Sequence, residues 1–107
     1  KNGVEKVKLH TSGDTHFITL SNSAIIRWET SLVPNANNTY DLGSTSLRWA
    51  NAYVNDLQLS NESKKDTGGN DVDGTWGDWT LQEGENDIFM INNRTGKKYS
   101  ITMKEVE

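Results

Sequence analysis

The sequence contains no cysteine and only one proline among its 107 residues. The absence of cysteine excludes disulfide bonds, thiolate metal sites and a cysteine nucleophile. No apolar run reaches the roughly 20 residues of a membrane-spanning helix, and none forms the core of a signal peptide. The first residue is Lys1 rather than Met, so we expect the chain to begin inside a larger gene product or after a removed tag.

Positive charge is scarce as well. Lys and Arg number 11 against 15 Asp and Glu, which gives a formal net charge of −4. The lysines are dispersed except for two adjacent pairs, so no basic stripe is present to neutralise phosphates. Neither nucleic acid nor insertion into a membrane is therefore expected.

Sequence motifs of catalysis are missing too. The chain has no Gly-x-Ser-x-Gly elbow, no glycine-rich phosphate loop and no helix carrying paired histidines. Carboxylate pairs occur only in apparent loops, where water solvates them, as at Asp71/Asp73 and Glu83/Glu85. We therefore expect no enzymatic activity and no cofactor.

Hydrophobic residues make up 33% of the chain, and Ile, Leu, Val and Phe together about one fifth, near the border where chains fail to fold alone. The polar residues are mostly Asn, Ser, Thr, Gly and Asp, and the apolar ones recur with strand periodicity. This combination predicts an all-β protein of short strands whose core is completed by identical neighbours.

The N-terminal third predicts three short strands. Val7, Leu9 and Thr11 alternate with polar residues, Phe17 to Leu20 forms a second apolar run, and a polar turn separates the two. The residues from Ile26 to Leu32 alternate again and predict a third strand.

The most structured stretch by sequence is Pro34 to Asn55. Its first half is rich in turn-forming residues, with Pro34 restricting φ and Gly43 permitting positive φ. Ser44 is a suitable N-cap for a short helical turn over Ser46 to Ala50. A period-two pattern from Tyr53 to Leu59 then predicts a strand.

This stretch resembles a known signature. Tyr40-Asp41-Leu42-Gly43-Ser44, Leu47-Arg48-Trp49 and Ala52-Tyr53 are similar to the Y-D-L-G-S…R-W…Y motif of tail fibres and tailspikes of double-stranded DNA phages. In that family the motif commonly lies near the end of a trimeric fibre, before a C-terminal knob or a self-cleaving chaperone domain. The resemblance, which covers about a quarter of the chain, implies a homotrimer located in the virion as a tail appendage.

The resemblance also implies structural roles in folding and trimerisation for the residues of the signature. An Asp41–Arg48 ion pair would clamp the turn, and Trp49 and Tyr53 would fill the space beneath it. The residues concerned are Tyr40, Asp41, Leu42, Gly43, Arg48, Trp49 and Tyr53. Self-cleavage is not carried over, because the Ser-Asp pair that opens the chaperone domain is absent at Ser60-Asn61.

The segment from Asn61 to Gly74 contains one aliphatic side chain and three glycines, which predicts a loop and a domain boundary. We expect residues 1–60 to form a shaft end that carries the signature at 34–55, and residues 61–107 to form a C-terminal β knob. The pattern of the knob is a meander of three strands. The first strand is marked by Trp76 to Leu81, and the second spans Asp87 to Asn92 and is expected to be buried on both faces. A hairpin turn at Asn93 to Gly96 leads to the third strand, in which Tyr99, Ile101 and Met103 are expected to point inward.

Two tryptophans of the knob are candidates for ligand binding. An exposed indole with an adjacent Asp and a nearby Asn is suited to stacking on a sugar ring and bonding its hydroxyls. The candidate residues are Trp76, Asp78, Trp79 and Asn86. The competing interpretation is that these tryptophans pack in a core or a trimer interface.

Metal binding is not expected. Asn70 to Gly74 resembles half a calcium loop, but the first and twelfth positions are Gly69 and Thr80, where acidic residues are needed. His10 and His16 lack a metal-binding spacing and are expected to be surface residues.

These observations predict a C-terminal fibre module that trimerises and binds a host cell-surface glycan or an outer-membrane protein. One alternative is a passive trimerisation cap without ligand. Another is a carbohydrate-binding module of a non-viral protein.

Overall fold

The computed structural model describes residues 7–13, 15–20 and 25–107. The described chain is predominantly β, as predicted, with one short 3₁₀ helix. It divides into two compact units, Lys1–Val33 and Pro34–Glu107. The predicted division into 1–60 and 61–107 stays a prediction, although a strand of the first range pairs with a strand of the second.

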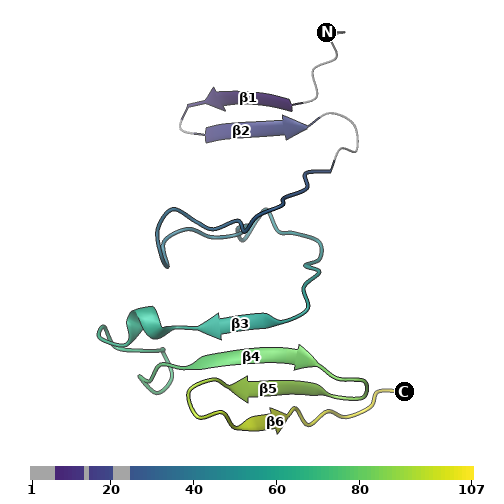
Figure 1. The fold of residues 1–107 in the computed structure, drawn as a ribbon. Helices are drawn as coiled ribbons and strands as arrows, with labels where there is room; N and C mark the ends of the chain where they lie inside the picture. The colour runs from purple at the N-terminus through teal and green to yellow at the C-terminus, as the bar shows by residue number, and fades with distance from the viewer. Residues whose placement is uncertain (1–6, 14, 21–24) are drawn as a thin grey trace. The chain divides into compact units, whose positions relative to one another are not determined.

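The first unit contains one β-hairpin (Figure 1). Strand β1, Val7–Ser12, pairs antiparallel with β2, Thr15–Leu20, so that Val7 faces Leu20 and Ser12 faces Thr15. Gly13 adopts a φ of 61° in the connecting turn, a conformation that glycine reaches without steric cost. The two strands confirm the first two strand predictions.

The predicted third strand is wrong. Residues 25–33 form neither strand nor helix, and their side chains are exposed, Trp28 among them. An extended segment becomes a strand only when a neighbour accepts and donates its backbone hydrogen bonds. Within the described residues no strand pairs with this segment.

The second unit contains a four-stranded antiparallel meander in the order β3-β4-β5-β6 (Figure 1). Its strands are β3 at Leu57–Ser60, β4 at Asp78–Glu83, β5 at Ile88–Asn92 and β6 at Lys98–Ser100. Tight turns join the last three strands. Gly84 donates to Asp87 in the first turn, and Gly96, with a φ of 78°, closes the second as the sequence predicts.

The register gives the sheet one apolar face and one mainly polar face, because residues opposite each other in a ladder point to the same side. A row that crosses the apolar face consists of Leu57, Leu81, Met90 and Tyr99. The adjacent row on the other face consists of Gln58, Thr80, Ile91 and Lys98. The face that carries Leu57, Leu81, Met90 and Tyr99 is called the apolar face below. It also carries Leu59, Trp79 and Ile88.

Within the second unit, no further layer covers the apolar face. Leu57 and Leu59 are almost half exposed, β5 is half-buried along its length, and no described hydrophobic side chain is fully buried. The prediction of complete burial for β5 is therefore not met within one chain. Tyr99 lies on the apolar face, as predicted, although it is exposed. The inward orientation predicted for Ile101 and Met103 is not met within one chain, since both are exposed and β6 ends at Ser100.

Between β3 and β4 runs a 17-residue connection, residues 61–77, which contains the 3₁₀ helix η1 at Glu62–Lys64. Lys65 forms an ion pair with Glu62 at 3.6 Å. Asn61 closes the connection at its base: its N–H donates to the Gly77 carbonyl at 3.3 Å, and its side-chain Oδ1 accepts from the Gly77 N–H at 2.8 Å. These two hydrogen bonds between Asn61 and Gly77 hold the two ends of the loop together beside the sheet.

The stretch from residue 34 to 56 is an irregular corner without helix or strand. The helical turn predicted for 46–50 is wrong. Ser44 instead closes a tight turn on Leu47, with its N–H donating to the Leu47 carbonyl and its Oγ accepting from the Leu47 N–H. The backbone bond therefore runs in the opposite sense to that of a helix, in which later N–H groups donate to earlier carbonyls. The strand expected from Tyr53 begins only at Leu57.

Candidate functional site

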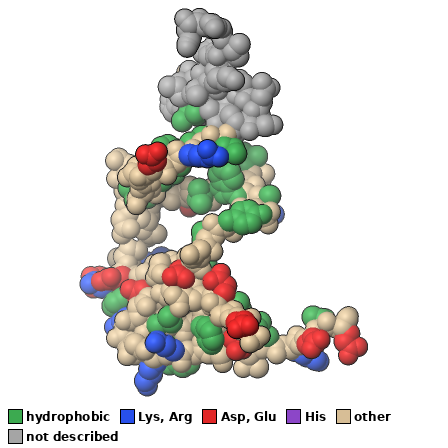
Figure 2. All heavy atoms as spheres, turned by 45° about the vertical axis from the view of Figure 1, so that its right-hand side comes forward, with side chains coloured by type: hydrophobic (Ala, Val, Ile, Leu, Met, Phe, Trp, Pro, Cys, Tyr) green, Lys and Arg blue, Asp and Glu red, His purple; other side chains and the backbone are tan. Residues whose placement is uncertain are grey.

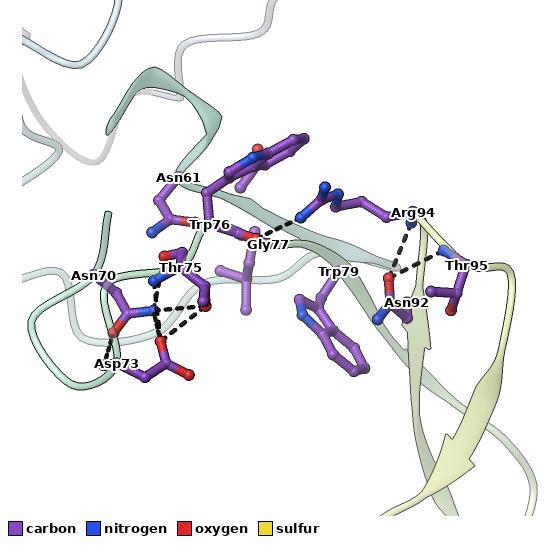
Figure 3. Close-up of a pocket in the computed structure, with 12 residues that line it drawn as sticks. Asn61, Asn70, Asp73, Thr75, Trp76, Gly77, Trp79, Asn92, Arg94 and Thr95 are labelled. Atoms are coloured by element: carbon purple, nitrogen blue, oxygen red, sulfur yellow. Dashed lines mark hydrogen bonds between the residues drawn. The ribbon is translucent and has the colours of Figure 1, made fainter. Parts of the chain in front are cut away.

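An open pocket of about 940 Å³ lies where β3 ends and β4 begins, beside the β5–β6 turn (Figure 3). Three segments that are distant in sequence supply its lining: the end of β3, the connection to β4, and the turn after β5. Both candidate tryptophans, Trp76 and Trp79, line it. The pocket is thus the place where the structure joins the predicted aromatic residues to polar groups from elsewhere in the chain.

One wall of the pocket is a small loop that its own side chains hold together. The Asn70 amide nitrogen donates to Asp73 Oδ1 at 2.7 Å and to the Thr75 carbonyl at 2.8 Å, while its oxygen accepts from the Val72 and Asp73 N–H groups. The Thr75 hydroxyl also donates to Asp73 Oδ1 at 2.8 Å. These bonds shape the loop without burying any apolar surface.

The same bonds act on the acidity of Asp73. Hydrogen bonds from the Thr75 hydroxyl, the Asn70 amide and the Thr75 backbone N–H lower the pKa of Asp73 below its ordinary value of 3.8, because they stabilise the charged carboxylate. The prediction of a loop at residues 70–74 is confirmed. The expectation that water alone solvates its carboxylates is wrong for Asp73, because protein groups donate hydrogen bonds to it. The Oδ1 atom of Asp73 accepts the hydrogen bonds that hold the loop. Among the described residues, no group of three His, Asp or Glu side chains could hold a metal ion.

Trp76 and Arg94 form the opposite wall. The guanidinium carbon of Arg94 lies 3.7 Å from the centroid of the indole ring, and Nη1 donates to the Trp76 carbonyl at 2.9 Å. A guanidinium stacked on an aromatic face keeps its edge available for in-plane hydrogen bonds. The arginine therefore covers one ring face of Trp76 and presents a planar donor to the pocket.

Trp79 lies against the backbone at Gly77. A Cβ at residue 77 would come within 3.0 Å of the Trp79 Nε1 atom, so glycine permits this close approach. On the apolar face the Trp79 ring meets Tyr99, with a centroid distance of 5.8 Å and an interplanar angle of 44°. The strands that carry the two rings, β4 and β6, flank β5. Trp79 consequently joins the pocket to the apolar face.

Asn92 ends β5 and organises the turn beside the pocket. Its Oδ1 accepts from the N–H groups of Arg94 at 3.0 Å and Thr95 at 3.3 Å. This Asx turn positions the backbone of Arg94, from which the side chain reaches Trp76. Figure 3 shows the two hydrogen bonds and the arginine directed toward the indole.

The other two predicted ligand-binding residues do not line the pocket. Asp78 accepts from the Asn93 amide at 2.9 Å and belongs to a polar network on the face opposite Trp79, around the buried Thr80. Asn86 lies in the turn between β4 and β5, at the far end of β4. The two-residue alternation of a strand places Asp78 and Trp79 on opposite faces, and the length of β4 separates Asn86 from both.

The signature residues lie away from the pocket and are exposed. Gly43 has the expected positive φ, 86°, and lies close to the Trp49 ring. Trp49 is 68% exposed and Tyr53 92%, so neither fills a space within this chain. No ion pair joins Asp41 to Arg48, both of which are described.

Sequence reasoning missed the polar side of the pocket. Asn61 and Arg94 lie in segments that the sequence correctly marks as loop or turn, and Asn92 is the last residue of a predicted strand. Nothing in their local patterns shows that these segments meet at the N-terminal end of β4. The only sequence signal for a site was the presence of amide side chains and an arginine in the same domain as the tryptophans. Their proximity depends on the strand register, which is a tertiary property.

Comparison with known proteins adds no relative to this description. No protein-family model matches the chain, and no curated protein or solved structure is similar enough to match it. Within the described part of the chain, no helix is long and apolar enough to cross a membrane.

Proposed function

We propose that the chain is a structural and adhesion module of a phage tail fibre or related virion appendage. In this proposal three copies associate through apolar surface that a single copy leaves open. The pocket beside Trp76 and Trp79 then binds a glycan on the host cell surface.

The observation that carries the proposal is the missing core. Among the described residues no hydrophobic side chain is buried, and the only buried residue is Thr80. Full burial of a large apolar side chain contributes about 1.5–3 kcal/mol, and the described residues, which bury their apolar side chains only in part, have less of this free energy to offset conformational entropy. Association with further copies supplies that burial.

The distribution of the exposed apolar residues supports association through particular surfaces. In the second unit most of them lie on the apolar face of the sheet and along the corner at residues 40–54, and the others lie in the loop before β4 and after β6. Figure 2 shows hydrophobic side chains at the surface. Exposed patches of this kind on a soluble protein mark interaction sites. Three copies, rather than two, follow from the resemblance of Tyr40 to Tyr53 to the fibre signature.

The pocket supports the adhesion part of the proposal. Trp76 and Trp79 are half-buried, so each is held by the fold and keeps some ring surface in contact with solvent. Carbohydrate sites combine such rings with fixed amide, hydroxyl and charged groups. The pocket has this composition, with Asn61, Asn92 and Arg94 close to the indoles.

Light scattering tests the association. The chain mass is 12.0 kDa, and a trimer has three times that mass. Leu57→Asp on the apolar face should shift the particle toward monomer, whereas Ser100→Asp on the other face should not. A folded wild-type monomer at micromolar concentration would refute the fibre architecture.

A glycan array tests adhesion and separates it from the two alternatives. Binding by the intact oligomer that Trp76→Ala abolishes supports the adhesion module. A trimer with a blank array favours the passive cap, or an outer-membrane protein as the receptor. A monomer that binds sugar favours a carbohydrate-binding module of a non-viral protein. One site of millimolar affinity corresponds to about −4 kcal/mol, so avidity among three sites would be needed on a cell surface.

A further inference from the structure

The hydrogen-bonding groups that remain open in the pocket are mainly donors. The Asn61 Oδ1 atom accepts from the Gly77 N–H, and the Asn92 Oδ1 atom accepts from the Arg94 and Thr95 N–H groups. Because backbone N–H groups require acceptors, these bonds determine which end of each amide is the oxygen. Each Nδ2 group, with two N–H donors, has no partner among the described residues.

Arg94 adds further donors in a fixed orientation. A guanidinium carries five N–H groups, and the described residues provide one acceptor for them, the Trp76 carbonyl at 2.9 Å. Stacking at 3.7 Å on the indole holds the plane of the group. Planar donors held in this way match the two oxygens of a carboxylate.

One acceptor balances these donors. The Asp73 carboxylate lines the pocket from the loop on the opposite side, as Figure 3 shows. Its Oδ1 atom accepts from Asn70 and Thr75, which leaves Oδ2. Asp73 and Arg94 form no ion pair with each other. The pocket therefore has a cationic, donor-rich wall and an acidic wall, with indole surface between them.

We propose that the pocket selects an acidic saccharide. The carboxylate of the sugar faces Arg94, and the open amide groups of Asn61 and Asn92 donate to other oxygens of the sugar. Its hydroxyls donate to Asp73 Oδ2, and its ring lies on indole surface. This inference rests on the proposed adhesion function and specifies the ligand class of the same site.

A neutral sugar fits this set of groups less well. Each neutral hydroxyl must donate as well as accept, and the donor-rich wall offers few acceptors. Donors that lose water without gaining an acceptor weaken binding. A carboxylate accepts from several donors at once and donates to none. The difference predicts at least a tenfold preference for the acidic member of a matched pair of saccharides.

Two matched pairs of probes test the preference on the intact protein by titration calorimetry. The first pair is an oligomer of galacturonic acid and the same oligomer with its carboxyl groups reduced to alcohols. The second pair is sialyllactose and lactose. We expect binding of at least one acidic member, at least tenfold tighter than that of its neutral partner, and weakened by added salt.

Substitutions assign the preference to the pocket. Arg94→Gln should remove it, and Arg94→Lys should restore it only in part, because charge returns without the planar fork. Asn92→Asp retains the oxygen that accepts from the turn but replaces the open donor with a negative acceptor, so acid binding should fall at least tenfold. Lys104→Gln removes a positive charge outside the pocket and should leave the preference unchanged. Circular dichroism verifies that each variant is folded.

The outcomes distinguish this inference from the function on which it rests. Equal or tighter binding of the neutral partners overturns the acidic preference and leaves the adhesion module standing. Acidic preference that survives in both Arg94→Gln and Asn92→Asp also overturns the inference, because another surface then supplies it. Absence of binding to both pairs and to a broad glycan array overturns both proposals.

Discussion

At the residue scale, individual glycines and polar side chains set the geometry of the pocket. Residues 65–74 contain a single aliphatic side chain, the exposed Val72, so hydrogen bonds and backbone conformation determine the shape of this loop. Gly69, with a φ of 66°, occupies a position where a Cβ atom would collide with the Gly74 carbonyl. Asn70 and Asp73 then complete the loop with their side chains.

Gly69→Ala is therefore expected to destabilise the loop severely. The substitution combines the strain of a positive φ with a backbone collision that no side-chain rotation relieves. Gly96→Ala is the matched control, because Gly96 also has a positive φ but no atom within 4 Å of its Cβ position. The control should cost about 1–2 kcal/mol, and Gly69→Ala should cost more. Chemical denaturation measures both, and equal losses would contradict the collision.

The titration of Asp73 predicts a dependence of the loop on pH. Its pKa in the folded chain is lowered by the Thr75 hydroxyl first, and then by Asn70 and the Thr75 N–H. A lowered folded pKa means that this stabilisation is fully present above the ordinary value of 3.8 and is lost as the pH falls through the lower folded value. Asp73→Asn should abolish this dependence. Carboxyl NMR titration gives the folded pKa directly, and an unshifted value would refute the prediction.

At the element scale, the turns of the meander position aromatic side chains by leaving room for them. Gly84 begins the β4–β5 turn, and a Cβ there would approach the Phe89 ring to 2.5 Å. Gly77 precedes β4 and admits the Trp79 indole in the same manner. The strands set which face each residue takes, and the glycines set how closely the rings approach the backbone.

Gly77→Ala tests this arrangement at the pocket. The new methyl group would lie 3.0–3.2 Å from the Trp79 ring, so the indole must move by a few tenths of an ångström. We expect a loss of about 1 kcal/mol, at the lower end of the range for overpacking, and a change in Trp79 fluorescence as its contact with Tyr99 shifts. Trp79→Phe in both backgrounds assigns the signal. An unchanged spectrum would show that Trp79 does not lie against Gly77.

At the scale of the whole molecule, burial of the exposed side chains is the property that a single copy lacks. The Trp49 indole is 68% exposed and contacts the Gly43 region. In an isolated chain its removal would cost little. In a trimer that encloses the corner it would remove an aromatic anchor of the interface.

Trp49→Ala separates these cases. If the corner is an interface, we expect a loss of about 2–4 kcal/mol per chain in the denaturation free energy of the oligomer, together with a shift of the mass toward monomer. Trp28→Ala, also at an exposed tryptophan but outside the signature, is the comparison. A loss below 1 kcal/mol with an unchanged mass would show that the corner has no role in association.

Local pattern was sufficient for the elements with short-range causes. Alternation predicts β1, short apolar and aromatic runs predict β2, β4 and β5, and Asn-Arg-Thr-Gly at 93–96 predicts the hairpin turn. All of these signals arise from neighbours in the chain. The corner at 44–47 shows the limit of such reasoning. The serine that suits a helix cap closes a different turn, since its hydroxyl bonds the Leu47 N–H in either arrangement.

Tertiary structure alone decided which residues share a site. Sequence identifies Trp76 and Trp79 as unusual, but only the pairing of β3, β4 and β5 brings Asn61, Asn92 and Arg94 to them, and the same alternation places Asp78 on the opposite face. Tertiary structure also decided which apolar side chains are buried. An apolar residue in a strand can pack inside its own sheet or remain open for another chain, and its local pattern is the same in both cases, because periodicity records which face a residue takes and not what covers that face.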